Sequence, residues 1–165
     1  IYDIPNSDIE TRIRELADTF DLGSFLNTPG RNLSLGQRIR CEITASLIHK
    51  PRVLFLDEPT IGLDPVVKES IRELIMRMNT ELHTTVFLTS HDVGDIEKLC
   101  RRIIIVNGGR IVLDDSMEHL KSHYLHRKHK ENAQPSEVTL ESIITEIYKA
   151  QSLQHPEAPE PGMEV

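Results

Sequence analysis

The sequence predicts an α/β fold in which helices flank a parallel sheet that ends in an antiparallel hairpin. Two short apolar runs, residues 53–56 and 85–89, have the pattern of strands buried on both faces of a parallel sheet. The segment between them, from Asp64 to about residue 82, has helical periodicity, and a strand–helix–strand order joins parallel neighbours. Apolar runs on both sides of residues 107–109 (Asn-Gly-Gly) predict the hairpin, which we place at the edge of the same sheet.

Two helices are expected before the first strand. Ser7 and Glu10 have the spacing of a capping box, and apolar residues then recur with helical period to about residue 20. Ser34 and Gln37 repeat that spacing ahead of a second apolar stripe. A second helix should therefore begin at Ser34 and end before the proline at position 51.

After the second strand, the sequence predicts three further helices. A short one follows residues 90–92 (Ser-His-Asp), another runs from Ser116 to about residue 125, and a third covers residues 139–150 with a clear apolar stripe. Residues 126–138 begin with a basic run and lack an apolar rhythm, so we interpret them as a linker. Residues 151–165 combine prolines with acidic side chains, which is typical of a disordered tail.

Composition excludes several classes of protein. The 165 residues carry 19 Lys and Arg against 26 Asp and Glu, a formal net charge of −7, which argues against a main role in neutralising nucleic acid phosphates. No apolar run approaches the roughly 18 residues that suggest a membrane-spanning helix. The two cysteines, Cys41 and Cys100, are too few and too far apart for a disulfide scaffold or a zinc site.

The first candidate site lies where the two predicted strands end. Asp57 and Glu58 follow the first strand, and His91 follows the second, so all three belong at the carboxyl edge of the sheet, where α/β folds bind ligands. One carboxylate there can hold Mg²⁺ while its neighbour orients a water that attacks a terminal phosphate. Taken singly, an Asp-Glu pair is more often a solvated acidic turn, and a lone histidine is more often structural. Their shared edge favours phosphate chemistry.

The second candidate site is the start of the second helix. Residues 33–37 (Leu-Ser-Leu-Gly-Gln) place the Ser34 hydroxyl and the Gly36 amide at a helix N-terminus, where free N–H groups attract anions. A plain capping box explains the same residues, and for this segment alone it is the better explanation.

Together these motifs resemble the nucleotide-binding domain of ATP-binding cassette (ABC) transporters. The segments L-S-L-G-Q, V-L-F-L-D-E-P, I-G-L-D and S-H-D occur in that order within about residues 1–125. They are similar to the family's signature motif, Walker B strand, D-loop and switch histidine. The sequences of residues 31–38, 57–65 and 139–147 are most similar to those of the export branch of the family. By that resemblance the chain is identified as part of a P-loop NTPase domain.

The resemblance implies a role for each motif residue. Asp57 would coordinate Mg²⁺, Glu58 would polarise the attacking water, and His91 would contact the γ-phosphate of ATP. Because the family closes two domains head to tail around two nucleotides, the signature would contact ATP bound to the facing subunit, and the D-loop would lie at the dimer seam. The residues expected there are Leu33, Ser34, Leu35, Gly36, Gln37 and Asp64.

Two departures from the family pattern stand out. Leu35 replaces the glycine most common at the middle of the signature, which we expect to be tolerated. No G-x-x-x-x-G-K followed by Ser or Thr occurs in the sequence, so the phosphate cradle and its lysine are missing. We therefore expect that the Walker A half is not part of this sequence and that the chain alone has little ATPase activity. Residues 1–50 would be the end of the helical subdomain and residues 51–125 part of the catalytic core.

The resemblance also implies partners and a location. We expect a second nucleotide-binding subunit, identical or different, together with integral membrane permease subunits, at the cytoplasmic face of the plasma membrane. Nucleic acid is not an expected partner. Two other functions stay open: a non-catalytic module that supplies only its signature face to a partner ATPase, and a non-transport ABC ATPase. The second usually has a long coiled coil or basic arm, and only residues 126–130 are basic here.

Overall fold

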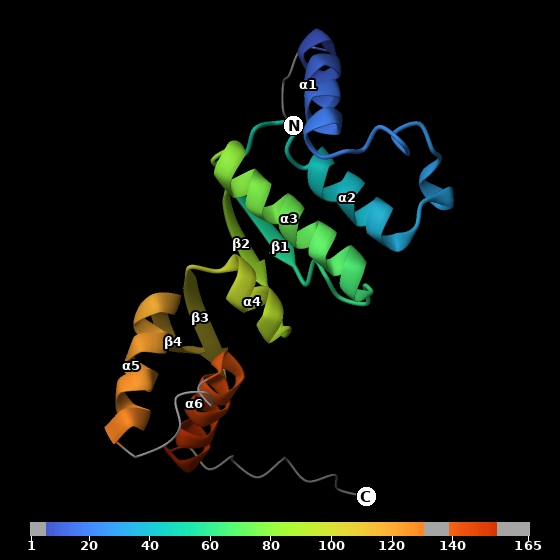
Figure 1. The fold of residues 1–165 in the computed structure, drawn as a ribbon. Helices are drawn as coiled ribbons and strands as arrows, with labels where there is room; N and C mark the ends of the chain where they lie inside the picture. The colour runs from blue at the N-terminus through green and yellow to red at the C-terminus, as the bar shows by residue number, and fades with distance from the viewer. Residues whose placement is uncertain (1–5, 131–138, 155–165) are drawn as a thin grey trace, which may run out of the picture. The chain divides into compact units, whose positions relative to one another are not determined.

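The computed structural model describes residues 6–130 and 139–154, and these described residues form two compact units that meet in the sequence between Leu99 and Cys100 (Figure 1). The predicted domain of residues 1–125 is thus divided between Leu99 and Cys100. The first unit contains four α-helices, one 3₁₀ helix and two strands among its described residues: α1 (Asn6–Thr19), η1 (Gly30–Asn32), α2 (Leu35–Ala45), β1 (Val53–Asp57), α3 (Pro65–Glu81), β2 (Thr85–Thr89) and α4 (Val93–Leu99).

The parallel pair β1–β2 is confirmed. Its register runs from Val53 opposite Thr85 to Asp57 opposite Thr89, so the carboxyl ends of both strands lie side by side. The connection between them is α3, which begins with Asp64 as N-cap and Pro65 in the first turn, as the sequence predicts. This register brings together the loops that follow the two strands.

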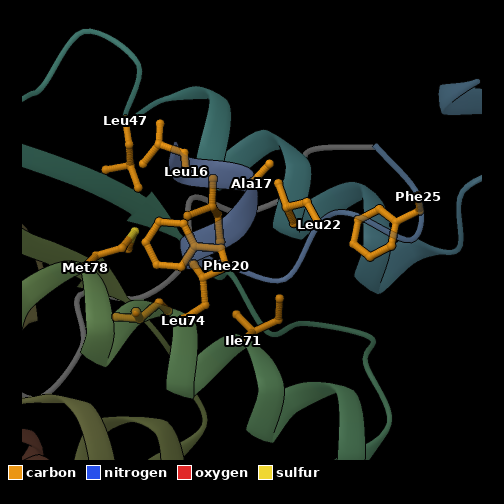
Figure 2. Close-up of a cluster of buried hydrophobic side chains, with 11 residues drawn as sticks. Leu16, Ala17, Phe20, Leu22, Phe25, Leu47, Ile71, Leu74 and Met78 are labelled. Atoms are coloured by element: carbon orange, nitrogen blue, oxygen red, sulfur yellow. The ribbon is translucent and has the colours of Figure 1, made fainter. Parts of the chain in front are cut away.

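The core of the first unit lies between the three long helices and one face of the strand pair. Figure 2 shows Phe20, which directly follows α1, among side chains of α3, including Leu74 and Met78. Leu54 and Leu56 of β1 pack against the same cluster. The buried members are Leu16, Ala17, Phe20, Leu22, Phe25, Ile43, Leu47, Ile71, Leu74, Ile75 and Met78.

The expectation that the strands are buried on both faces is wrong for the described residues. Val53, Phe55 and Phe87 are 48%, 73% and 48% exposed, and the rings of Phe55 and Phe87 lie 5.4 Å apart. Successive side chains of a strand point to opposite faces, so these three lie opposite the core-facing residues. The described residues of the first unit do not cover that second face.

The second unit contains the predicted hairpin, formed by β3 (Arg102–Asn107) and β4 (Arg110–Ser116). Gly108 and Gly109 have φ values of +54° and +73°, which the tight turn requires and glycine adopts without strain. The hairpin is a two-stranded sheet of its own, so the expectation that it extends the parallel pair as an edge is wrong. The physical reason is that a hairpin's two strands pair through their adjacent positions in the chain, so the hairpin forms without a third strand.

Two helices complete the second unit, α5 (Met117–Lys130) and α6 (Leu140–Gln154). Helix α5 extends to Lys130, so the first five residues of the predicted linker are helical, and residues 131–138 lie outside the described range. Helix α6 likewise includes the first four residues of the predicted tail, and residues 155–165 lie outside the described range. Among the described residues, no helix has the length and apolar character needed to span a membrane.

Candidate functional site

The first group of candidate residues lies at the carboxyl ends of β1 and β2, and we call Asp57, Glu58, Thr89 and His91 the strand-end cluster. The Glu58 backbone N–H donates to the Thr89 carbonyl and to its hydroxyl oxygen, each at 3.2 Å. The Thr89 hydroxyl in turn donates to Asp57 Oδ1 at 2.5 Å. Thr89 therefore orients both carboxylate residues, although the sequence analysis did not select it.

Glu58 and His91 face each other across the two loops. Nδ1 of His91 lies 3.0 Å from Oε1 of Glu58, with the Glu58 side chain 29% exposed and the His91 side chain 72% exposed. Glu58 has a φ of +47°, in the left-handed region that non-glycine residues rarely adopt. Such a conformation persists only where surrounding contacts hold it, and the two hydrogen bonds to Thr89 provide them. The sequence prediction that these two residues share one edge is met.

The strand-end cluster fits a metal that arrives with a nucleotide. Asp57 is exposed, and its Oδ2 has no partner among the residues that the structure describes. Within those residues, no group of three His, Cys, Asp or Glu side chains could hold a metal by itself. Mg²⁺ commonly takes only one or two carboxylates and completes its shell with water and phosphate oxygens. A single carboxylate with an open oxygen matches that mode.

The second group lies at the starts of α2 and α3, and we call Ser34, Gly36, Gln37, Asp64 and Val67 the helix-start cluster. Ser34 forms the predicted capping box: its hydroxyl accepts from the Gln37 amide at 3.2 Å, and Gln37 Oε1 accepts from the Ser34 amide at 3.0 Å. Asp64 Oδ1 accepts from the amides of Val66 and Val67 at 3.0 Å each. Both helix starts are therefore capped by their own side chains.

Gly36 joins the two helix starts. It is buried, and a Cβ placed on it would lie 2.3 Å from Cγ1 of Val67 on α3. The absence of a side chain at Gly36 is thus required for helix packing within the chain, a role that the sequence analysis did not foresee. Of the other signature residues, Leu33 is half-buried and Leu35 is 50% exposed. Their contact with a nucleotide stays a prediction.

A buried charged network lies next to the strand-end cluster, and the sequence analysis missed it. Its centre is the pair Arg72 and Asp95, whose side chains are 11% and 1% exposed. Burial opposes the charge on Arg72, yet its hydrogen bonds to Asp95 and Glu69 raise its pKa above the ordinary value. No sequence pattern links residues 23 positions apart on different helices.

Asp92, which directly follows His91, is part of the same network. Its hydrogen bond from Lys68 lowers its pKa below the ordinary value, against an opposing effect of burial. A lowered pKa in the folded state adds stability above the ordinary aspartate pKa, and this stability is lost as the pH falls through the folded value. The loop that carries His91 is therefore held by a charge that persists at neutral pH.

A family model described as "AAA domain, putative AbiEii toxin, Type IV TA system" matches residues 2–94, which are more than half of the chain. The chain belongs to this AAA domain family. Its matched residues include every residue of the strand-end and helix-start clusters.

The curated relatives are named as ATP-binding proteins of methionine import. The methionine import ATP-binding protein MetN 1 of Listeria monocytogenes is 35% identical over 109 residues, which are 66% of this chain and 32% of that protein. MetN of Photorhabdus laumondii is 32% identical over 120 residues, 73% of this chain and 35% of that protein. The chain thus spans about a third of the length of these relatives. The expected export branch finds no support here, because both are named import proteins.

Solved structures agree with this assignment. The cbiO1 protein of Clostridium perfringens, described as part of the ABC transporter complex cbiONQ, has a TM-score of 0.66 and 28% identity, covering 76% of this chain and 51% of that one. The ATP-binding cassette MJ0796, described as a dimer in a post-hydrolysis state bound to ADP and Pi, has a TM-score of 0.57 and 27% identity, covering 69% and 49%. The chain corresponds to part of an ABC ATPase nucleotide-binding domain, and the predicted fold class is confirmed.

Proposed function

We propose that this chain forms part of the ATP-hydrolysing subunit of an ABC transporter, which drives a substrate across a membrane through separate permease subunits. The observation that carries the proposal is the Glu58–His91 pair, held 3.0 Å apart at the end of a parallel sheet. The relatives support it because their names describe ATP-binding transport proteins. The subunit would act at the cytoplasmic face of the membrane and pair with a second nucleotide-binding subunit.

The strand-end cluster suits hydrolysis of a terminal phosphate. The Glu58 carboxylate is partly shielded and close to the open edge, so it can accept a hydrogen bond from a water and orient it toward phosphorus. His91 is largely exposed, and its doubly protonated ring can donate to a phosphate oxygen through Nε2 while Nδ1 donates to Glu58. Asp57 would hold Mg²⁺ through Oδ2, and that ion would neutralise charge on the phosphates.

The helix-start cluster suits the opposite half of a paired site. In this proposal Ser34 and Gly36, with Leu33, Leu35 and Gln37, present the start of α2 to ATP bound by the facing subunit. The Ser34 oxygen already accepts from the Gln37 amide, so its hydroxyl hydrogen is the group left to donate to a phosphate. Asp64, which caps α3, would lie at the seam between the two subunits.

The decisive experiment replaces Glu58 in the full-length protein that contains this chain. Glu58→Gln keeps the size of the side chain and removes its charge, so we expect phosphate release to fall by about 100-fold to 10,000-fold while ATP binding persists. Glu73→Gln, an exposed glutamate on α3, is the matched control and should keep normal turnover. Unchanged phosphate release in Glu58→Gln would remove Glu58 from the reaction.

Export and import are the two candidate directions of transport, and an experiment with the full-length protein can distinguish them. The sequences of the motifs favour export, and the names of the MetN relatives favour import. Reconstitution with the membrane subunits in vesicles, with ATP supplied on one side only, shows whether substrate moves toward or away from the nucleotide.

A second candidate function is a module that supplies only its signature face. The helix-start cluster favours it, because both helix starts are capped and packed on each other by residues of this chain. This function predicts that adding the chain to an ABC ATPase that has its own Walker A motif raises the phosphate release of that partner. No increase would rule the module out.

A further inference from the structure

Asp95 uses both of its carboxylate oxygens at a site that solvent does not reach. The residue is 1% exposed. Its Oδ1 accepts from Nε of Arg72 at 2.7 Å and forms an ion pair with Nη2 of the same side chain at 2.5 Å. Its Oδ2 accepts from the hydroxyls of Thr60 and Ser90, the latter at 3.2 Å. A buried carboxylate with three hydrogen-bond donors and a paired guanidinium has both oxygens satisfied and is therefore held firmly in place.

The two hydroxyls on Oδ2 belong to the two loops that carry the strand-end cluster. Thr60 lies two residues after Glu58, in the loop that follows β1. Ser90 immediately precedes His91, in the loop that follows β2. A single oxygen atom of Asp95 therefore connects the loop of Glu58 with the loop of His91.

Helix α3 anchors this connection from the other side. Arg72 binds Asp95 and also lies 3.8 Å from a carboxylate oxygen of Asp92, while Lys68 donates to Asp92 at 2.5 Å. Asp92 Oδ1 accepts from the amides of Gly94 and Asp95 at 2.9 and 3.3 Å, which starts α4. The loop with His91 is thus held immediately before and immediately after the histidine.

The Glu58–His91 pair cannot maintain this geometry alone. The His91 side chain is 72% exposed. Exposed ion pairs add little to stability, because holding both side chains in one arrangement costs conformational entropy. The hydrogen bonds from the Glu58 backbone N–H to Thr89 hold Glu58 itself, and the buried contacts of Asp95 are placed to hold the rest of its loop against the loop of His91.

We propose that Asp95 is a positioning residue that clamps the two loops through Thr60 and Ser90 and so keeps Glu58 and His91 in register for hydrolysis. The catalytic part of this inference rests on the proposed ATPase function, whereas the clamp between the loops does not. Asp95 itself does not touch the nucleotide, so its removal acts through the position of the two catalytic groups.

The test uses Thr60→Val in the full-length protein, because this change removes one hydroxyl and leaves the Arg72–Asp95 pair intact. We expect kcat for ATP hydrolysis to fall by about 10-fold or more, since small misplacements of catalytic groups are costly, with KM for ATP within about 2-fold of wild type. Thr60→Ser restores the hydroxyl and should restore kcat. Glu69→Gln removes the charge of a partly exposed residue that pairs with Arg72 and Lys98, keeps the Arg72–Asp95 pair, and should leave kcat unchanged.

Hydrogen exchange provides a second readout that does not depend on activity. In Thr60→Val, peptides over residues 58–64 and over residues 90–92 should both exchange faster than in wild type, although only the first contains the substitution. Faster exchange confined to residues 58–64 would overturn the clamp, and so would an unchanged kcat when both loops exchange faster. A wild-type protein without ATP turnover would instead contradict the proposed function, and the exchange comparison would then decide the clamp alone.

Discussion

The strand-end cluster and the helix-start cluster are organised by different kinds of contact. In the helix-start cluster the caps are local: Ser34 pairs with Gln37, and Asp64 with Val66 and Val67, at separations of two or three residues. In the strand-end cluster every contact links two distant segments, such as Thr89 with Asp57, which are 32 residues apart. The caps of the first cluster form wherever their helices form, whereas the second cluster exists only when the two strands are paired and their loops are in place.

This difference predicts where single substitutions do most damage. Loss of a local cap should cost one hydrogen bond and leave other segments unchanged. Loss of a long-range partner should leave a buried charge unpaired or expose it to solvent, and it should disturb several loops together. Three substitutions, compared as changes in the free energy of unfolding of the full-length protein, test this contrast.

The largest effect is expected at Arg72. Arg72→Met removes the charged partner of Asp95, which is 1% exposed, and a buried charge without its partner typically costs about 3–5 kcal/mol. Denaturant unfolding measures this loss. Arg77→Met on the same helix is the matched control: its side chain is 39% exposed in its ion pairs with Asp21 and Glu81, so it should cost only about 1 kcal/mol. Equal costs for the two variants would show that the buried network is not formed.

An intermediate effect is expected at Gly36, the long-range contact of the helix-start cluster. Gly36→Ala would place a methyl group 2.3 Å from Cγ1 of Val67, and overpacking of this kind costs about 1–3 kcal/mol. Thermal unfolding of the single variant measures the cost. In the double variant, Val67→Ala removes the atom that the new methyl group meets. Gly36→Ala should therefore cost less stability when it is added to Val67→Ala than when it is added to the wild-type protein. Additive costs in this double-mutant cycle would contradict the packing role.

The smallest effect is expected at Ser34, where the contact is local. Ser34→Ala removes the hydroxyl of the capping box, and such a loss typically costs about 1 kcal/mol. Hydrogen exchange should become faster only in the first turn of α2. Ser34→Asp keeps an acceptor and should retain most of the stability. Faster exchange at residues 90–92 in Ser34→Ala would break the distinction between the two clusters.

Much of the fold was predictable because its signals are local. The capping box at Ser34, the Asp64-Pro65 start of α3 and the Gly108-Gly109 turn each depend on neighbouring residues, and each is present in the structure. The parallel pairing of β1 and β2 followed from the helix between them. The two wrong expectations concern which segments pack on each other. The hairpin forms its own sheet, and the described residues of the first unit leave one face of the parallel pair uncovered.

The candidate site was predictable only in part. The motif segments place Asp57, Glu58 and His91 at one edge, and the Glu58–His91 distance of 3.0 Å agrees with that expectation. Thr89 could have been found from the strand register, because it is the residue opposite Asp57. The direction of transport was not predictable from these residues, since they act on a nucleotide.

The sequence alone determined the elements, the order of the motifs and the edge at which the acidic pair and the histidine meet, because caps, turns and strand ends depend on adjacent residues. Only the tertiary structure decided that Asp95 connects Thr60 with Ser90 and that Gly36 lies against Val67. Contacts of this kind depend on how α2, α3 and α4 pack around the strands, and such packing has no periodic signature along the chain.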